Sequence, residues 1–308
     1  MATEEPHRCR RRRILQKYPN VKALFGHDPN AKWMCLVLVM SQLYMSTVVQ
    51  GSSWWVYCSL VYVVGATLTQ ALFLAVHETA HNLVFQKPIA NKWFSLVLNL
   101  PIVLPFSIAF RHYHIDHHTY QGVEGLDTDL PTDAEVARIK GRLAKFVWMA
   151  FQIVMYAVRP LIHGKNQLRP SWMLFHNVAG QLLFDLLLYH LYGVGPHLYL
   201  LACVVVAGGI HPCAGHFLSE HYTFSSGTQE TFSYYGKLNL LTWNVGYHNE
   251  HHDFPNVSAS KLPAVYRTAT EFYEPLVKCE SWTRTIFKYI TNPEYGPHCR
   301  VRRSEKDV

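Results

Sequence analysis

The sequence predicts an all-α integral membrane protein, and three observations lead to that prediction. Of the 308 residues, 49% are hydrophobic and only 16% are charged, against the usual quarter or so. Two long stretches, 33–76 and 171–219, are nearly free of charge, and eight histidines fall into three tight clusters. We therefore expect four transmembrane helices in two hairpins, interfacial helices, and a cytosolic histidine-rich domain that binds two metal ions.

The first segment, residues 1–32, is basic and contains the run Arg8 and Arg10–Arg13. Such a run could bind nucleic acid, but the apolar stretches that follow favour a role at a membrane surface or in topology. We expect no nucleic-acid partner, and the positive charge places this segment in the cytosol. We also expect no cleavable signal peptide, because the first 30 residues lack an apolar core. The seven cysteines are widely spaced without a CxxC pair, which argues against a zinc ribbon or a disulfide scaffold.

The membrane domain is assigned to residues 33–295, followed by a C-terminal tail at 296–308. Residues 33–76 contain no Asp, Glu, Lys or Arg and would make roughly 66 Å of helix, about two bilayer crossings. A turn near 51–53 divides them into spans at about 33–51 and 54–76. Residues 171–219 carry one charge, Asp185, and a turn at 193–196 gives spans at about 172–192 and 197–219.

Asp185 is unusual because an ionisable residue inside a span is costly and often functional. Two explanations remain open from the sequence. Its carboxylate could contact polar groups of a lipid substrate, or it could pair with His176 or His190 within the helix bundle.

Two further apolar segments are not expected to cross the membrane. Residues 92–110 contain Pro101 and Pro105, so we expect a re-entrant or interfacial segment there. Residues 145–162 are assigned to an interfacial helix, because a crossing would place the last histidine cluster on the wrong side. Both termini and all three histidine clusters then face the cytosol.

The three histidine clusters predict a metal centre. Their spacings are HxxxH, HxxHH and HxxHH, and positions i, i+3 and i+4 share one face of a helix. Eight imidazoles are too many for one ion and suit two, and imidazole binds iron, copper, zinc or nickel. The clusters are His77 and His81; His114, His117 and His118; and His248, His251 and His252. We call them the first, second and third histidine boxes.

Acidic neighbours of the boxes have two possible roles. Glu78, Asp116, Glu250 and Asp253 could accept the second ring N–H of a ligating histidine. Alternatively, they are ordinary surface charges.

Two other functions compete with a di-metal oxidase. Residues 77–81 also match HExxH, the zinc protease motif with Glu78 as general base, but the other two boxes have no role in that mechanism. A transporter would not need clustered histidines on one side of the membrane. A di-iron centre that uses dioxygen accounts for all three boxes.

The boxes HETAH, HYHIDHH and HNEHH resemble those of the membrane fatty-acid desaturase and hydroxylase superfamily. The stretch Asn244–Pro255, NVGYHNEHHDFP, is most similar to the sphingolipid Δ4-desaturases. The resemblance extends from about residue 10 to about residue 295 and includes Asp127-Thr128-Asp129.

This resemblance implies an oxidoreductase of the endoplasmic reticulum membrane with a cytosolic active site. Its reaction is the O2-dependent insertion of a trans double bond at carbons 4 and 5 of the sphingoid base of dihydroceramide, giving ceramide. The family implies two Fe2+ ions, with electrons from NAD(P)H through a reductase and a separate cytochrome b5. Related enzymes hydroxylate carbon 4 instead, and this alternative stays open.

The resemblance also implies a ninth ligand. Glu220-His221-Tyr222 is similar to a Glu-His-Tyr motif of related alkane hydroxylases, in which the histidine binds iron. His221 is preferred to His216, and His211 is expected to cap or pack instead. The implied catalytic and metal-binding set is His77, His81, His114, His117, His118, His221, His248, His251 and His252.

Overall fold

The structure, a computed structural model, describes residues 6–163, 165, 167–224 and 229–304. Within these residues the backbone forms helices and isolated β-bridges but no β-strand. The α-helices are α1 (Pro6–Lys17), α2 (Ala31–Val48), α3 (Trp54–Leu60), α4 (Ala66–Ala80), α5 (Pro88–Asn99), α6 (Ser107–Tyr120), α7 (Asp133–Arg138), α8 (Gly141–Ala150), α9 (Gln152–His163), α10 (Trp172–Tyr192), α11 (Gly195–Ala207), α12 (His216–Ser219), α13 (His248–Asp253), α14 (Leu262–Thr268), α15 (Thr270–Tyr273) and α16 (Trp282–Thr291). Short 3-10 or π segments are η1 (Pro19–Leu24), η2 (Val61–Gly65), η3 (Leu100–Ile102), η4 (Pro212–Gly215), η5 (Lys237–Leu241) and η6 (Ala259–Lys261).

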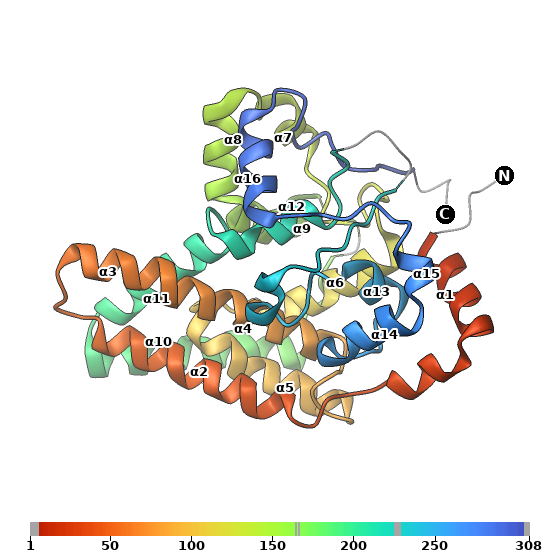
Figure 1. Cartoon of the computed structure of the whole chain (residues 1–308). Helices are drawn as coiled ribbons and strands as arrows, with labels where there is room; N and C mark the ends of the chain where they lie inside the picture. The colour runs from red at the N-terminus through yellow and green to blue at the C-terminus, as the bar shows by residue number, and fades with distance from the viewer. Residues whose placement is uncertain (1–5, 164, 166, 225–228, 305–308) are drawn as a thin grey trace.

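The long apolar helices α2, α3–α4, α5, α10 and α11 pack side by side in one half of the molecule (Figure 1). Among the described residues, three stretches are long and apolar enough to cross a membrane: Ala31–Val48, Trp54–Ala80 and Gly195–Ser219. The number rises to five if each of two sharply bent helix pairs is one span. The short helices α1, α13, α14 and α15 gather at one end of this bundle (Figure 1).

The second predicted span extends further than the sequence suggested. Helix α3 continues through η2 into α4, so the helical run passes residue 76 and ends at Ala80. His77 therefore lies within the helix, and His81 is its C-cap residue. Gly65 allows α11 to approach η2 closely, because a Cβ there would lie 2.3 Å from Cys203 Sγ.

Helix α10 covers the residues expected for the third span, 172–192, but it is not among the three stretches that are long and apolar enough to cross a membrane. The Ser171 side chain caps its start by accepting from the Leu174 N–H at 3.2 Å. Leucines 182, 183, 186 and 187 are exposed on its outer face, as lipid-facing residues would be. The Asp185 carboxylate accepts from Gln181 Nε2 at 2.9 Å and lies 3.9 Å from His197 Nε2. Its histidine neighbour is thus on α11 and is neither His176 nor His190.

The fourth predicted span, 197–219, is not one continuous helix. Helix α11 ends at Ala207, and the chain continues through η4 and α12. Gly208 and Gly209 follow the helix and favour its end, while Pro212 has no N–H to offer a continuing helix. The resulting break lies just before the residues that approach the histidine boxes.

The two further apolar segments are sharply bent. This agrees with the irregular segment predicted at 92–110, but the single interfacial helix predicted at 145–162 is wrong, because the chain there is divided between α8 and α9. The α5–η3 segment and α6 meet at 114°, and α8 and α9 meet at 78°. At the first bend the Asn99 Oδ1 accepts the N–H groups of Phe106 and Ser107 at 3.0 and 2.8 Å. This side chain satisfies the free N–H groups at the start of α6, the helix that carries the second histidine box.

Candidate metal centre

The nine predicted ligands converge on one place from four distant parts of the chain. Helix α4 and its C-cap supply the first box, α6 supplies the second, α13 supplies the third, and His221 follows α12. All nine side chains are buried or half-buried.

Five of these histidines form what we call the first cluster: His77, His81, His114, His118 and His251. Their candidate ligand nitrogens all lie within 4.8 Å of one another. The Nε2 atoms of His81 and His114 are 2.8 Å apart, and His251 Nε2 is 3.1 Å from both His77 Nε2 and His118 Nε2.

The other four form the second cluster: His117, His221, His248 and His252. Candidate ligand nitrogens of His117, His221 and His252 lie within 4.8 Å of one another. The Nε2 of His221 is 3.1 Å from that of His117 and 2.9 Å from that of His248.

The second and third boxes are each divided between the two clusters. Successive residues of an α-helix are rotated by about 100°, so positions i and i+4 point almost the same way and position i+3 points aside. In α6 the i, i+4 pair His114 and His118 joins the first cluster and His117 the second. In α13 the pair His248 and His252 joins the second cluster and His251 the first. One short helix therefore serves both clusters.

The spacing of these nitrogens fits metal binding. Neutral imidazoles whose Nε2 lone pairs face each other repel unless a proton or a cation lies between them. Cis ligands at a metal–nitrogen distance of about 2.1 Å would be about 3 Å apart, and the Nε2–Nε2 distances here run from 2.8 to 3.2 Å. The donor set is entirely nitrogen, which suits iron, zinc or copper.

Carboxylates outside the boxes orient the ring of His117. Its Nδ1 lies 3.0 Å from Asp127 Oδ1 and 3.4 Å from Asp129 Oδ2. The second oxygen of Asp127 accepts the Gly122 N–H at 2.7 Å and lies 3.6 Å from Arg300. Burial alone would raise the pKa of Asp127, but His117 and Arg300 hold it below its usual value. An ionised Asp127 keeps the ring proton on Nδ1 and leaves Nε2 free for the cluster.

Two other ligand histidines have Nδ1 near an oxygen atom: a backbone carbonyl for His221 and, at a distance too long for a hydrogen bond, a carboxylate for His248. His221 Nδ1 lies 3.3 Å from the backbone oxygen of Glu230. His248 Nδ1 lies 3.6 Å from Glu220 Oε1, which is also 2.7 Å from His216 Nδ1.

Of the carboxylates suggested by the sequence, Glu78 lies near a ligating histidine, His77, whereas Glu250 and Asp116 have other partners. Glu250 accepts from Ser233 Oγ and Tyr235 OH at 2.9 and 2.7 Å, and burial raises its pKa to about 7. Asp116 lies 3.7 Å from His112, a histidine outside the boxes. Asp127, Asp129 and Glu220 were missed as histidine partners, although each lies in a stretch that carried the family resemblance.

Glu78 is also not placed as a free base. Its Oε2 accepts the Ala259 N–H at 3.0 Å, and its Oε1 lies 3.7 Å from His77 Nδ1. The side chain is buried and fixed to the backbone of a distant segment, which disfavours the zinc protease interpretation.

His216 and His211 lie outside both clusters. The His216 ring contacts Phe217 and Trp282. His211 caps η4, where its Nδ1 accepts the Cys213 N–H at 3.3 Å.

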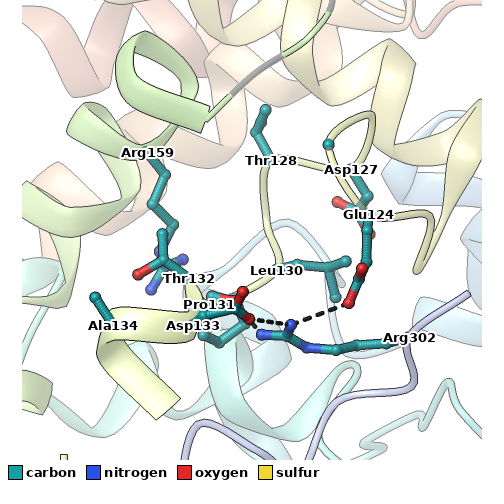
Figure 2. A pocket seen from close by; sticks show the side chains of 11 residues that line it. Glu124, Asp127, Thr128, Leu130, Pro131, Thr132, Asp133, Ala134, Arg159 and Arg302 are labelled. Atoms are coloured by element: carbon teal, nitrogen blue, oxygen red, sulfur yellow. Dashed lines mark hydrogen bonds and ion pairs between the residues drawn. The ribbon is translucent and has the colours of Figure 1, made fainter. Parts of the chain in front are cut away.

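A polar cavity of about 220 Å³ is lined by Asp127 and by residues that follow it in the chain (Figure 2). Arg302 bridges Glu124 and Asp133 at 3.1 and 2.7 Å across this cavity. Because charged and hydroxyl side chains line it, it does not suit an alkyl chain. We regard it as part of the support of Asp127.

Comparison with known proteins agrees with this geometry. The family model described as fatty acid desaturase matches residues 52–280, and the model described as sphingolipid Delta4-desaturase (DES) matches residues 1–30. The protein named sphingolipid delta(4)-desaturase DES1 of Drosophila melanogaster is 46% identical, over 99% of this chain and 95% of its own length. The Homo sapiens protein of the same name is 41% identical, over 99% of this chain and 94% of its own. A Caenorhabditis elegans protein named putative sphingolipid delta(4)-desaturase/C4-monooxygenase is 42% identical, over 99% of this chain and 84% of its own. The chain thus belongs to the fatty acid desaturase family.

Proposed function

We propose that this protein is a sphingolipid Δ4-desaturase. It uses dioxygen to insert a trans double bond between carbons 4 and 5 of the sphingoid base of dihydroceramide, giving ceramide. The observation that carries the proposal is the convergence of nine histidines into two interleaved clusters. Similarity over almost the whole chain to proteins named sphingolipid delta(4)-desaturases supports the substrate.

The proposed metal ligands are the nine histidines, five in the first cluster and four in the second. Two iron ions supply, when bound, the reduction of dioxygen and the removal of hydrogen from an unactivated C–H bond. Zinc competes well for imidazole sites, so overexpressed protein could carry zinc instead.

The chain's own groups prepare the ligands for this role. Asp127 and Asp129 hold the Nδ1 proton of His117, and the Glu230 carbonyl accepts from His221. Each contact turns an Nε2 lone pair toward a cluster. The burial of most of the ligands excludes bulk water. Solvent therefore does not compete with a substrate C–H bond for reaction at the site.

The proposed topology has four spans in the endoplasmic reticulum membrane, with both termini and the boxes in the cytosol. Cytochrome b5 and its reductase would then deliver electrons from NAD(P)H on the cytosolic side. The apolar outer face of α10 and the bends after α5 and α8 support this arrangement.

Inserted glycosylation acceptor sites test the topology. A site near Gly122 should stay unmodified, and one near Ser52 or Gly195 is the site open to modification if its short loop is accessible. A site near Gly227, a position outside the described residues, should also stay unmodified. Modification at Gly122 would contradict the arrangement.

A second outcome, hydroxylation of carbon 4, has a specific observation in its favour. The related Caenorhabditis elegans protein carries both activities in its name. Desaturation and hydroxylation would share the first hydrogen removal, so a barrier difference of about 1.4 kcal/mol changes the product ratio tenfold. We propose desaturation as the main outcome because Asn249 matches the desaturase-dominant members of the family that the sequence resembles.

Expression in cells that lack their own Δ4-desaturase tests the function. Lipid mass spectrometry should show ceramide in place of dihydroceramide, with little 4-hydroxy product. A His251→Ala variant is the matched control, because it removes one ligand, and it should insert into the membrane but form no ceramide. Absence of ceramide with the unaltered chain would contradict the proposal, and mainly 4-hydroxy product would contradict only the choice of outcome.

A further inference from the structure

The N-terminal helix α1 packs directly against α13, the helix that carries the third histidine box. Figure 1 shows α1 lying along the end of the molecule beside α13 and α15. This helix falls within residues 1–30, the part matched by the sphingolipid Delta4-desaturase model, and outside the general desaturase match at 52–280. A helix from residues 1–30 thus contacts the helix that carries the third histidine box, although the two are far apart in the sequence.

Arg10 donates hydrogen bonds to residues near both ends of α13. Its Nε and Nη2 donate to the two oxygens of Asp253 at 2.6 and 2.8 Å, and Nη2 also donates to Asn249 Oδ1 at 3.0 Å. Asp253 is 1% exposed, so its charge would be costly without this partner. Because α13 has only six residues, it cannot hold its own shape, and contacts at Asn249 and Asp253 fix its direction.

His7 connects α13 to the segment beside His221. Its Nδ1 lies 2.7 Å from Asp253 Oδ1, and its Nε2 lies 2.9 Å from Thr231 Oγ1. The same hydroxyl lies 3.4 Å from His221 Nδ1. The His7 ring is also 5.0 Å from the His252 ring, centroid to centroid. His7 therefore links the two segments that supply His221 and His252 to the second cluster.

From these contacts we infer that α1 is a clamp that holds the third box in its metal-binding position, with Arg10 and His7 as positioning residues. This inference rests on the proposed metal centre. The apolar anchor of α1 is separate: Ile14 is buried in a hydrophobic cluster with Val265 and Tyr273. The polar contacts of Arg10 and His7 can therefore be removed while the helix keeps its apolar packing.

The experiment compares full-length proteins purified in detergent with iron bound. The variants are Arg10→Met, Arg10→Lys and His7→Ala. The control is Arg13→Ala, which removes one positive charge from the same helix, but from a guanidinium that lies over Phe272 at 5.5 Å. The readouts are iron atoms per chain, iron retention against a chelator, and the Mössbauer spectrum of 57Fe-loaded protein.

We expect the unaltered chain and Arg13→Ala to hold two irons with the same spectrum. Arg10→Met and His7→Ala should weaken the binding of one iron by about 10–100-fold, the usual effect of losing a residue that orients metal ligands. They should also alter one of the two iron signals in the Mössbauer spectrum. Arg10→Lys should be intermediate, because an ammonium can pair with Asp253 but lacks the planar fork that also reaches Asn249.

Several results would overturn the clamp. Wild-type chelator resistance and an unchanged spectrum in both Arg10→Met and His7→Ala would do so, as would an equal loss of iron in Arg13→Ala. If Arg10→Met does not fold, the decision passes to Arg10→Lys and His7→Ala, judged in the same way. An unaltered chain that binds no iron and forms no ceramide would contradict the proposed function instead, so the two failures are distinguishable.

Discussion

Replacing Asp127 by Asn should weaken the second cluster without removing a ligand. The carboxylate accepts from four directions: Oδ1 lies 3.0 Å from both His117 Nδ1 and the Asp129 N–H, and Oδ2 meets Gly122 and Arg300. An amide keeps one oxygen and puts its NH2 group where the other was. In either orientation of the amide, its NH2 group then faces N–H groups that the carboxylate had accepted from.

The size of the effect follows from these contacts. A buried backbone N–H left without an acceptor costs about 1–3 kcal/mol, and the unfolding free energy should fall by that amount. If the amide oxygen turns to Gly122, His117 loses its orienting partner and metal affinity should fall about 10–100-fold. The first cluster should keep its metal, because its five ligands do not contact Asp127 directly.

Iron content and ceramide formation, measured on the same purified protein, check this prediction. Asp133→Asn is the matched control: it removes one carboxylate from the same loop region, but its side chain is 95% exposed and pairs with Arg302. Asp127→Asn protein with two tightly held irons and full activity would refute the assigned role of Asp127. An equal loss in Asp133→Asn would show that the loop, rather than the His117 contact, is responsible.

Three further results are expected. His221→Ala should abolish ceramide formation in the cell assay, whereas His216→Ala should retain part of it, and the reverse order would make His216 the ninth ligand. Arg159→Met should cost about 3–5 kcal/mol of stability at pH 7, because it leaves the buried Glu135 carboxylate without its cation. Burial alone would raise the pKa of Glu135, but hydrogen bonds from Arg159 hold it at about 2. The stability that this pair contributes should therefore be complete above pH 4.5 and should fade as the pH falls toward 2. The melting temperatures of the unaltered protein and of Arg159→Met should then converge in acid. Gly65→Ala should lower the stability by about 1–3 kcal/mol through overpacking against α11, and an unchanged melting temperature would contradict that close approach.

Local patterns in the sequence predicted part of this molecule well. The helix at 172–192 has the expected bounds, because Ser171 and Gly193 mark its two ends. The nine histidines that spacing and resemblance selected do converge. The end of α11 at Ala207 was missed, because an apolar composition continues past the residues that break the helix.

Other features depend on contacts between distant segments and could not be found this way. Asp127 meets His117 only because a turn with positive φ at Gly122 and Gly125 folds the chain back after α6. Asp253 was expected to serve a ligating histidine, yet its partners His7 and Arg10 lie more than 240 residues away. A pattern read along the chain identifies metal-binding residue types, but it does not show which carboxylate each one faces.

Because each HxxHH box is divided between the two clusters, the backbone of one helix carries ligands of both. Along α6, His114 and His117 serve different clusters because their side chains leave the helix in directions about 60° apart. In carboxylate-rich di-iron bundles, acidic side chains from the helices supply much of the ligand shell, and a carboxylate can change its mode of attachment. The directions in which side chains leave a helix cannot change in that way. The assignment of each histidine to its cluster is therefore fixed by the helical backbone of α6 and α13.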